Sequence, residues 1–316
     1  MSTRLPVVTA DEGTVLDGPS APPWPHQPTV EWQVCGVCNY DCSYCIQSKA
    51  SRVGHPDDET ITRALQLFAN LEGIWEIKMT GGEPFAFRGF VERIIPGLCA
   101  LPHRISVLTN LSAPLSVLER FARLTHGRLN IISASLHLEF TTPDEFLAKL
   151  QRVRDMVHAD TRMVVNSVLV PERLAEVQVA SEKVRAAGFR FFPQLMKVKK
   201  GVHAYTREQM EQVRAIVGDL RLAEETRSAN MAPAYTGRRC FTGARYFVLL
   251  QDGDAWSCRS ARRHGEGFLG NLRTGIRLRH GPVLCPYTIC PCSVPANRGM
   301  IEGVAAHVTR EEPDEA

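Results

Sequence analysis

Strand-like and helix-like runs alternate six times between residues 29 and 220, and this alternation constrains the fold more than any other feature of the sequence. Ile74–Thr80, for example, alternates apolar and polar residues as a strand does, whereas Asp58–Leu71 repeats apolar residues at a helical spacing. Consecutive βα units imply parallel strands joined by right-handed crossovers. A full barrel needs more units of this kind. The sequence therefore predicts an α/β fold in the form of a partial (β/α)6 TIM-like barrel, with a doubly wound sheet as the competing architecture.

The individual runs give the expected position of each element. Thr142 followed by Pro143 is typical of a helix start and Gly188 of a helix end, while Pro96 is expected to bend its helix. The predicted strands are Thr29–Cys35, Ile74–Thr80, Ile105–Leu108, Leu129–Leu136, Met163–Val170 and Phe191–Met196. The predicted helices are Asp58–Leu71, Phe87–Leu101, Pro114–Leu124, Thr142–Val157, Glu172–Ala187 and Thr206–Leu220. Chemistry is expected on the loops that follow the C-terminal ends of the strands.

The alternation stops near residue 222, which predicts a second, smaller unit. Tyr246–Leu250 and Ala255–Cys258 predict a β-hairpin with its turn at residues 252–254, and residues 239–292 contain five of the ten cysteines. The predicted organisation is a loose N-terminal arm over residues 1–28, a barrel over 29–221, a small cysteine-rich β-hairpin domain over 222–305 and an acidic tail over 306–316.

Composition narrows the class of protein. The chain has 37 Lys and Arg against 34 Asp and Glu, a formal net charge of +3, so nothing in it indicates the strongly basic surface of a nucleic-acid binder. A hydrophobic content of 44% with 22% charged residues is typical of a globular protein. No apolar run is long enough for a membrane span, and the N-terminus lacks a secretory signal, so a cytoplasmic protein is expected. Cytosolic thiols stay reduced, which favours metal binding or redox work over disulfides.

The loop after the first predicted strand carries three closely spaced cysteines. Cys38, Cys42 and Cys45 have the spacing C-x3-C-x2-C. Three thiolates on one short loop can hold three irons of a four-iron cluster and leave the fourth iron open to another ligand. Cys35 adds a fourth sulfur, so a structural zinc site is the alternative, although tetrahedral zinc usually takes two cysteine pairs separated by a longer loop.

A second motif follows the second predicted strand. Gly81 and Gly82 let the backbone approach a ligand closely, and the carboxylate of Glu83 can accept hydrogen bonds from an amine. A Gly-Gly-Glu-Pro sequence alone is a turn more often than a site. At the end of a neighbouring strand it is expected to face the cysteine loop.

The two motifs together resemble the radical S-adenosylmethionine (SAM) superfamily, over about residues 29–220. The resemblance implies that Cys38, Cys42 and Cys45 ligate a four-iron cluster and that SAM occupies the open iron. It also implies that Tyr44 lies beside the adenine and that the Gly81–Glu83 segment holds the methionine amine. An electron from the cluster would then cleave the sulfonium, and the 5′-deoxyadenosyl radical would abstract a substrate hydrogen.

Further strand ends carry polar residues that members of this superfamily also use. Ser135, after the fourth strand, matches a ribose-binding serine, while His137 stands where many relatives have an aspartate. Asn166 on the fifth strand is a candidate ribose or adenine contact, and Thr109 with Asn110 is a weaker candidate. The alternative is that these are ordinary hydrogen-bonded groups at strand ends. Two further cysteines, Cys35 and Cys99, are expected to be reduced structural thiols.

The C-terminal cysteines form a third pattern. Cys240, Gly253 and Cys258 have the spacing C-x12-G-x4-C, and Cys285, Cys290 and Cys292 follow. This resembles the twitch form of the SPASM extension, which implies an auxiliary four-iron cluster held by Cys240, Cys258 and two of the last three cysteines. The C-x4-C-x-C ending departs from the more usual C-x2-C, so the sequence leaves open which two. A structural zinc ribbon is the alternative, and it would have no redox role.

The favoured hypothesis is a radical SAM enzyme that acts on a small polar metabolite, such as a sugar-like or secondary-metabolite intermediate. Modification of a peptide or protein is the alternative. It is less favoured because only 28 residues precede Thr29, whereas many peptide-modifying relatives carry a recognition domain there. A structural zinc protein is the third possibility.

The expected cofactors are two four-iron clusters and SAM. The expected partners are a small-molecule substrate and a reductant such as flavodoxin or ferredoxin, without membrane or nucleic acid. The sequence indicates no single catalytic side chain, and it does not determine the substrate, the redox outcome or the oligomeric state.

Overall fold

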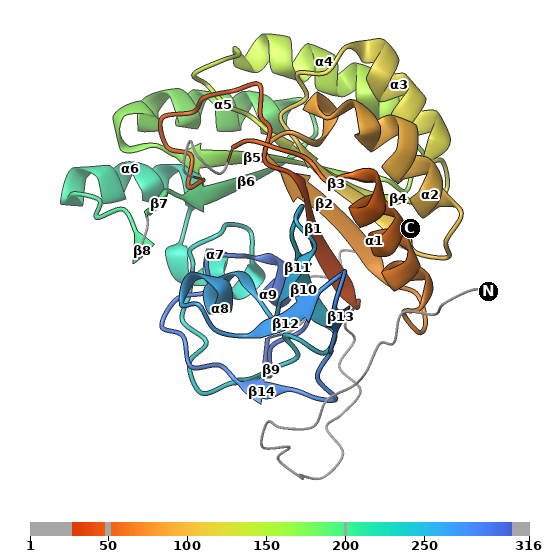
Figure 1. Cartoon of the computed structure of the whole chain (residues 1–316). Coiled ribbons are helices and arrows are strands. Elements are labelled where there is room, and N and C mark those ends of the chain that lie inside the picture. Colours follow the sequence, from red (N-terminus) through yellow and green to blue (C-terminus); the bar gives the residue numbers. More distant parts are fainter. Residues whose placement is uncertain (1–26, 48–51, 199–200, 305–316) are drawn as a thin grey trace, which may run out of the picture.

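A computed structural model describes residues 27–47, 52–198 and 201–304 (Figure 1). Its main sheet has the strand order β13-β12-β11-β10-β1-β2-β3-β4-β5-β6. Strands β1 to β6 are neighbours in chain order and pair in parallel, and the sheet stays open between β6 and β13. The prediction of an α/β fold built as a partial barrel is thus confirmed. The acidic tail and all but the last two residues of the predicted N-terminal arm lie outside the described residues.

The elements follow the predicted alternation. The strands are β1 (Thr29–Cys35), β2 (Glu76–Gly81), β3 (Arg104–Thr109), β4 (Leu129–Ser135), β5 (Arg162–Leu169), β6 (Arg190–Leu195), β7 (Lys197–Val198), β8 (Gly201–Val202), β9 (Arg239–Cys240), β10 (Tyr246–Leu249), β11 (Asp254–Trp256), β12 (Phe268–Asn271), β13 (Gly275–Ile276) and β14 (Val283–Leu284). The α-helices are α1 (Asp58–Ala69), α2 (Ile95–Cys99), α3 (Leu115–Leu124), α4 (Pro143–Met156), α5 (Leu174–Ala186), α6 (Arg207–Val217), α7 (Leu220–Thr226), α8 (Arg259–Arg263) and α9 (Val294–Asn297), with shorter turns η2 (Pro84–Ala86), η3 (Phe90–Ile94) and η4 (Pro171–Arg173).

Alternation along each strand divides the sheet into two faces. On β1, Val30 and Trp32 belong to the core under the helices. The Trp32 ring packs edge to face against the ring of Phe68 in α1, with 5.4 Å between the ring centroids. Glu31 points to the other face, as period-two geometry requires. Figure 1 shows helices such as α3, α4 and α5 along one side of the sheet and the C-terminal elements, in blue, on the other. The inner face of the partial barrel is therefore covered by the C-terminal part of the chain.

Two predicted helices differ from the observed ones for identifiable reasons. The helix expected over residues 206–220 ends at Val217, because Gly218 has a φ of +85° and Asp219 starts α7 by accepting a hydrogen bond from the Leu222 amide at 2.7 Å. The helix expected over 87–101 consists of the π-helix η3 and the short α2. Pro96 lies at the start of α2 and has no amide hydrogen to donate.

The C-terminal unit extends the barrel sheet. Strand β10 pairs in parallel with β1, and the predicted hairpin is β10–β11, which β12 and β13 continue in antiparallel. The boundary expected near residue 222 lies inside α7. A second apolar core, which includes Tyr246 and Met300, packs under these strands. None of the helices in the described part of the chain is both long and apolar enough to span a bilayer.

Candidate functional site

The loop after β1 is docked directly onto the Gly81–Glu83 segment. The amide of Gly82 donates to the carbonyl of Cys35 at 2.9 Å, and the amide of Glu83 donates to the carbonyl of Val37 at 2.8 Å. A Cβ atom on Gly82 would lie 2.1 Å from the Val37 oxygen, so only glycine fits there. The sequence predicted that the glycines allow close approach of a ligand; in this structure the atoms that approach closely are those of the cysteine loop itself.

The three cysteines of this loop lie close enough to influence one another. Cys42 is buried, whereas Cys38 and Cys45 are half-buried. Burial, together with the neighbouring sulfurs of Cys45 and Cys38, raises the pKa of the Cys42 thiol to about 12. A cation bound here would reverse that shift, because metal ligation deprotonates thiols. The loop therefore carries three cysteine sulfurs near one another.

Glu83 is buried behind this loop rather than pointing into open space. Its side chain is 1% exposed and accepts hydrogen bonds from the Phe85 amide at 3.2 Å, the Thr109 hydroxyl at 2.8 Å and the Asn110 amide at 2.7 Å. Burial raises the pKa of Glu83 to about 7, although these hydrogen bonds act in the opposite direction. The carboxylate thus joins the end of β2 to the end of β3. Thr109 and Asn110, weak candidates from the sequence, are its partners.

His137 holds the cysteine loop from the end of β4, a role that the sequence did not predict. Its Nδ1 atom lies 2.8 Å from the Tyr44 hydroxyl and 3.4 Å from the sulfur of Cys42. Burial lowers the pKa of His137 to about 4, so the ring is neutral and its Nδ1 can accept a hydrogen bond from the Tyr44 hydroxyl. The Ser-Leu-His sequence was the available signal, but only its serine had a predicted role. Glu139 adds a further contact by accepting from the Ser43 amide at 2.9 Å.

Ser135 and Asn166 are partners in the register between β4 and β5. Asn166 is 7% exposed, and its Nδ2 atom is buried without a hydrogen-bond partner among the described residues. A buried amide without a partner is costly, so this donor is available to a bound molecule. Tyr44, Gly81, Gly82 and Glu83, the other predicted cofactor contacts, come from the loops at this same end of the sheet. The two remaining thiols donate to main-chain carbonyls, Cys35 to that of Glu83 at 3.4 Å and Cys99 to that of Leu124 at 3.2 Å.

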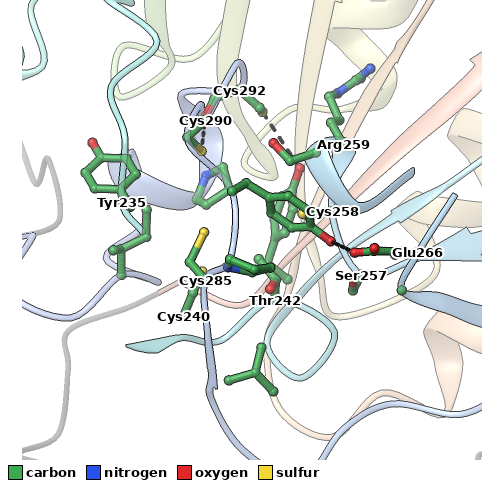
Figure 2. Close-up of a pocket in the computed structure, with 18 of the residues that line it drawn as sticks. Tyr235, Cys240, Thr242, Ser257, Cys258, Arg259, Glu266, Cys285, Cys290 and Cys292 are labelled. Carbon is green, nitrogen blue, oxygen red and sulfur yellow. Dashed lines mark hydrogen bonds between the residues drawn. The ribbon is translucent and has the colours of Figure 1, made fainter. Parts of the chain in front are cut away.

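A second group of thiols surrounds a cavity of about 230 Å³ in the C-terminal unit (Figure 2). The cavity is several times the ~30 Å³ share of one water molecule, which suits a group of several atoms. All five C-terminal cysteines contribute to its lining: Cys240, Cys258, Cys285, Cys290 and Cys292. Among the described residues, no three side chains of Cys, His, Asp or Glu meet at one point where a single metal ion would bind.

The sulfurs of these thiols are close enough to influence one another. Burial raises the pKa of Cys290 well above its ordinary value, and the neighbouring sulfurs act in the same direction, first that of Cys292 and then those of Cys240, Cys258 and Cys285. Burial likewise raises the pKa of Cys240 to about 12, with Cys258 and Cys285 contributing. In Figure 2, the side chains of Cys240, Cys285 and Cys290 lie along one side of the cavity, and Cys258 lies across it.

Cys292 belongs to a different environment. Its sulfur donates to the Glu31 carboxylate at 3.3 Å and lies 3.7 Å from the Tyr246 hydroxyl. Arg259 donates to the same carboxylate at 2.7 Å and to the Thr80 hydroxyl, the residue before Gly81, at 3.2 Å. Burial by itself would raise the pKa of Glu31, but the charge of Arg259 brings it down to about 2. This ion pair therefore joins the C-terminal unit to β1 and β2, and Cys292 contacts it.

Comparison with known proteins agrees with this geometry. Residues 32–172 match the family model of the radical SAM superfamily. A stretch of 88 residues is 32% identical to a GTP 3′,8-cyclase from Stenotrophomonas maltophilia (strain K279a), and the match covers 26% of each chain, about a quarter of that relative. The fold is similar to that of anSMEcpe with bound AdoMet (14% identity, TM-score 0.53), with 79% of this chain and 75% of that chain covered. It is also similar to Streptococcus suis SuiB bound to precursor peptide SuiA (13% identity, TM-score 0.55), with 78% of this chain and 62% of that chain covered.

Proposed function

From the premise that residues 32–172 form a radical SAM domain, we propose that this enzyme abstracts a hydrogen from a small polar metabolite, with a second iron–sulfur site in its C-terminal unit. The observation that carries the proposal is the docking of the C-x3-C-x2-C loop on Gly82 and Glu83 through two main-chain hydrogen bonds. This docking brings together the two motifs that are independent in the sequence.

Cys38, Cys42 and Cys45 would hold a four-iron cluster at the first site and leave one iron open. When bound, this cluster and SAM together supply the one-electron cleavage of the sulfonium that produces the hydrogen-abstracting radical. The chain's own contribution is to fix the loop. His137 forms a hydrogen bond with the Tyr44 hydroxyl, and Glu83 joins the strand ends behind the loop.

Several residues near this loop suit SAM itself. The unpaired Nδ2 of Asn166 can donate to a ribose or adenine atom, and Ser135 lies beside it. Tyr44 would lie next to the adenine, and the Gly81–Glu83 segment would hold the amine end. Because the Glu83 carboxylate already accepts three hydrogen bonds, its contribution to SAM affinity is expected to be both direct and through the loop it fixes.

The C-terminal cavity would hold the second cluster, as in twitch extensions. Four of the thiols that line this cavity would supply the ligands: Cys240, Cys258, Cys285 and Cys290. A four-iron cluster with four cysteine ligands is coordinatively complete and serves as an electron conduit. Cys292, which the sequence included among the candidate ligands, would remain a free thiol that donates to Glu31.

The polar side chains on the inner face of β1 and β2 support a small polar substrate. Glu31, Lys78, Thr80 and Arg259 lie on or against the inner face of β1 and β2. Charged and polar groups on this face suit a ligand that can hydrogen-bond to them better than an apolar one. Modification of a peptide or protein remains the alternative function, and an electron donor such as ferredoxin or flavodoxin is the expected partner for either.

Anaerobic incubation of the reconstituted protein with SAM and a reductant tests the proposal. We expect 5′-deoxyadenosine to form, and addition of a small-molecule extract to give a new product in proportion to it. A peptide fraction serves as the matched comparison, and a product formed only from that fraction would favour the alternative function. Stoichiometric zinc without iron, and no SAM cleavage, would contradict both.

A further inference from the structure

Lys197 is a cation close to the C-terminal thiol site, and it has no carboxylate partner in the described part of the chain. It lies in β7, directly beyond the end of β6, and its side chain is half-buried. Its ammonium donates to the Gln194 side-chain oxygen at 3.3 Å, and no Asp or Glu oxygen of the described residues forms an ion pair with it. Lys183, by contrast, pairs with Asp144 at 2.7 Å.

Both cations and cysteine sulfurs lie near Lys197. Burial lowers the pKa of Lys197 to about 8; the sulfurs of Cys292 and Cys290 oppose this shift, and the guanidinium groups of Arg259 and Arg263 add to it. Gathering three cations in a partly buried space is unfavourable unless an anion compensates them. Glu31 is already paired with Arg259 through two hydrogen bonds, so it does not fill this need.

A chain of hydrogen bonds fixes Lys197 relative to the cysteine segment. The Gln194 oxygen that accepts from Lys197 also accepts from the Asn230 amide at 3.4 Å. The same Asn230 amide donates to the carbonyl of Pro291, between Cys290 and Cys292, at 3.2 Å. Asn230 is 4% exposed, and its main chain bonds to Pro193 and Leu195 of β6. The ammonium is therefore tied to the end of the thiol site rather than free to move away.

We propose that Lys197 is a positioning residue for charge, whose ammonium compensates the negative charge of an iron–sulfur cluster held by the C-terminal thiols and raises the reduction potential of that cluster. The inference rests on the proposed function, because it presupposes a cluster at Cys240, Cys258, Cys285 and Cys290. Thiolate ligation makes such a cluster an anion, and its reduced form carries one more negative charge. A fixed cation nearby stabilises the reduced form more than the oxidised one.

The test measures the midpoint potential of this cluster by anaerobic redox titration followed by electron paramagnetic resonance. The parent is the full chain with Cys38, Cys42 and Cys45 changed to Ala, so that only the C-terminal cluster contributes. Lys197→Met and Lys197→Gln remove the charge, Lys197→Arg restores it, and Lys183→Met is the control at an exposed, paired lysine. Each variant is compared at full iron occupancy, about 4 irons per chain.

We expect Lys197→Met and Lys197→Gln to lower the midpoint potential, while Lys197→Arg and Lys183→Met leave it at the parent value. A merely structural role for Lys197 would change iron occupancy without shifting the potential of the protein that retains its cluster. An unshifted potential in both neutral variants overturns this inference and leaves the proposed function standing. A parent that takes up no iron at all overturns the C-terminal cluster of the proposed function together with the inference.

Discussion

The main-chain amide of Asn110 donates a 2.7 Å hydrogen bond to the carboxylate of Glu83, which joins the end of β3 to the loop that follows β2. Two more donors, the Phe85 amide and the Thr109 hydroxyl, complete the environment of this carboxylate. All three partners donate hydrogen bonds, so both side-chain oxygens of residue 83 must act as acceptors. This arrangement places Glu83 in the framework of the site.

Glu83→Gln is expected to weaken both the fold and SAM binding. The NH2 group of the glutamine would replace one acceptor oxygen and face a hydrogen-bond donor. This mismatch is expected to lower the free energy of unfolding by about 1–3 kcal/mol. SAM affinity is expected to fall at least about tenfold, because about 1.4 kcal/mol corresponds to one decade. Chemical denaturation and equilibrium SAM binding to the reconstituted protein measure the two effects.

Thr109→Val is the matched control for that change, because it removes one donor to Glu83 and keeps the carboxylate. Its cost in stability should be about 1 kcal/mol, and its SAM affinity should stay close to wild type. If Glu83→Gln binds SAM as tightly as wild type, the Gly-Gly-Glu-Pro segment has a structural role only.

Gly82→Ala is expected to displace the cysteine loop. The new Cβ would lie 2.1 Å from the carbonyl oxygen of Val37, immediately before Cys38, and backbone atoms cannot yield there without breaking the docking hydrogen bonds. We expect the loss of the first cluster, from about 8 to about 4 irons per chain after reconstitution. Iron and sulfide analysis measures this outcome.

Gly281→Ala is the control for that experiment, because nothing lies within 4 Å of a Cβ at that position. Its stability should lie within about 0.5 kcal/mol of wild type, with unchanged iron content. Full iron occupancy in Gly82→Ala would show that the loop can bind its cluster without being docked on the second motif.

The sequence could predict the features that depend on residues close together in the chain. Strand β1 has the predicted bounds, because a period-two pattern and the cysteines that end it are local features. The helix over residues 206–220 was predicted too long, because a glycine and an aspartate inside a helical pattern gave only a weak local signal against its apolar periodicity. Local patterns thus determined the elements and the positions of both motifs.

The contacts that assemble the site join residues far apart in the chain, and no local pattern encodes them. Cys42 meets His137 across 95 positions, and Arg259 reaches Glu31 across 228. The extension of the barrel sheet by β10 is of the same kind, since a parallel partner for β1 could come from any later strand. The sequence identified five C-terminal cysteines, but only their neighbours in space separate Cys292 from the other four.

The buried pair of Glu76 and Arg298 is expected to make stability depend on pH. Arg298 donates to both carboxylate oxygens at 2.5 and 2.7 Å. Burial alone would raise the pKa of Glu76, but the charge and hydrogen bonds of Arg298, with the hydroxyl of Ser106, lower it from 4.5 to about 2. The folded pKa lies below the unfolded one, so this contribution is present above pH 4.5 and is lost as the pH falls toward about 2.

Denaturation of the wild-type chain between neutral pH and the lowest pH at which it folds measures that loss, which we expect to be on the order of 2–4 kcal/mol. Glu76→Gln should lose this acid-dependent part. It should also be less stable at neutral pH by about 3–5 kcal/mol, because Arg298 is left buried without a counter-charge. An unchanged acid dependence in Glu76→Gln would assign it to other carboxylates.

The ligand set proposed for the C-terminal site gives the last prediction. Cys292→Ser keeps a donor for the Glu31 carboxylate, so the reconstituted variant should retain about 8 irons per chain and its visible iron–sulfur absorbance. Changing Cys285 and Cys290 to Ala removes two of the four converging sulfurs and should leave about 4 irons, while SAM cleavage at the first site continues. The two variants carry changes in the same eight-residue segment, so a general loss of folding would affect both. If Cys292→Ser loses the second cluster and the double variant keeps it, then Cys292 is a ligand and must turn away from Glu31 when the cluster binds. Tightly bound zinc in place of iron at this site would instead make the C-terminal unit a structural metal domain.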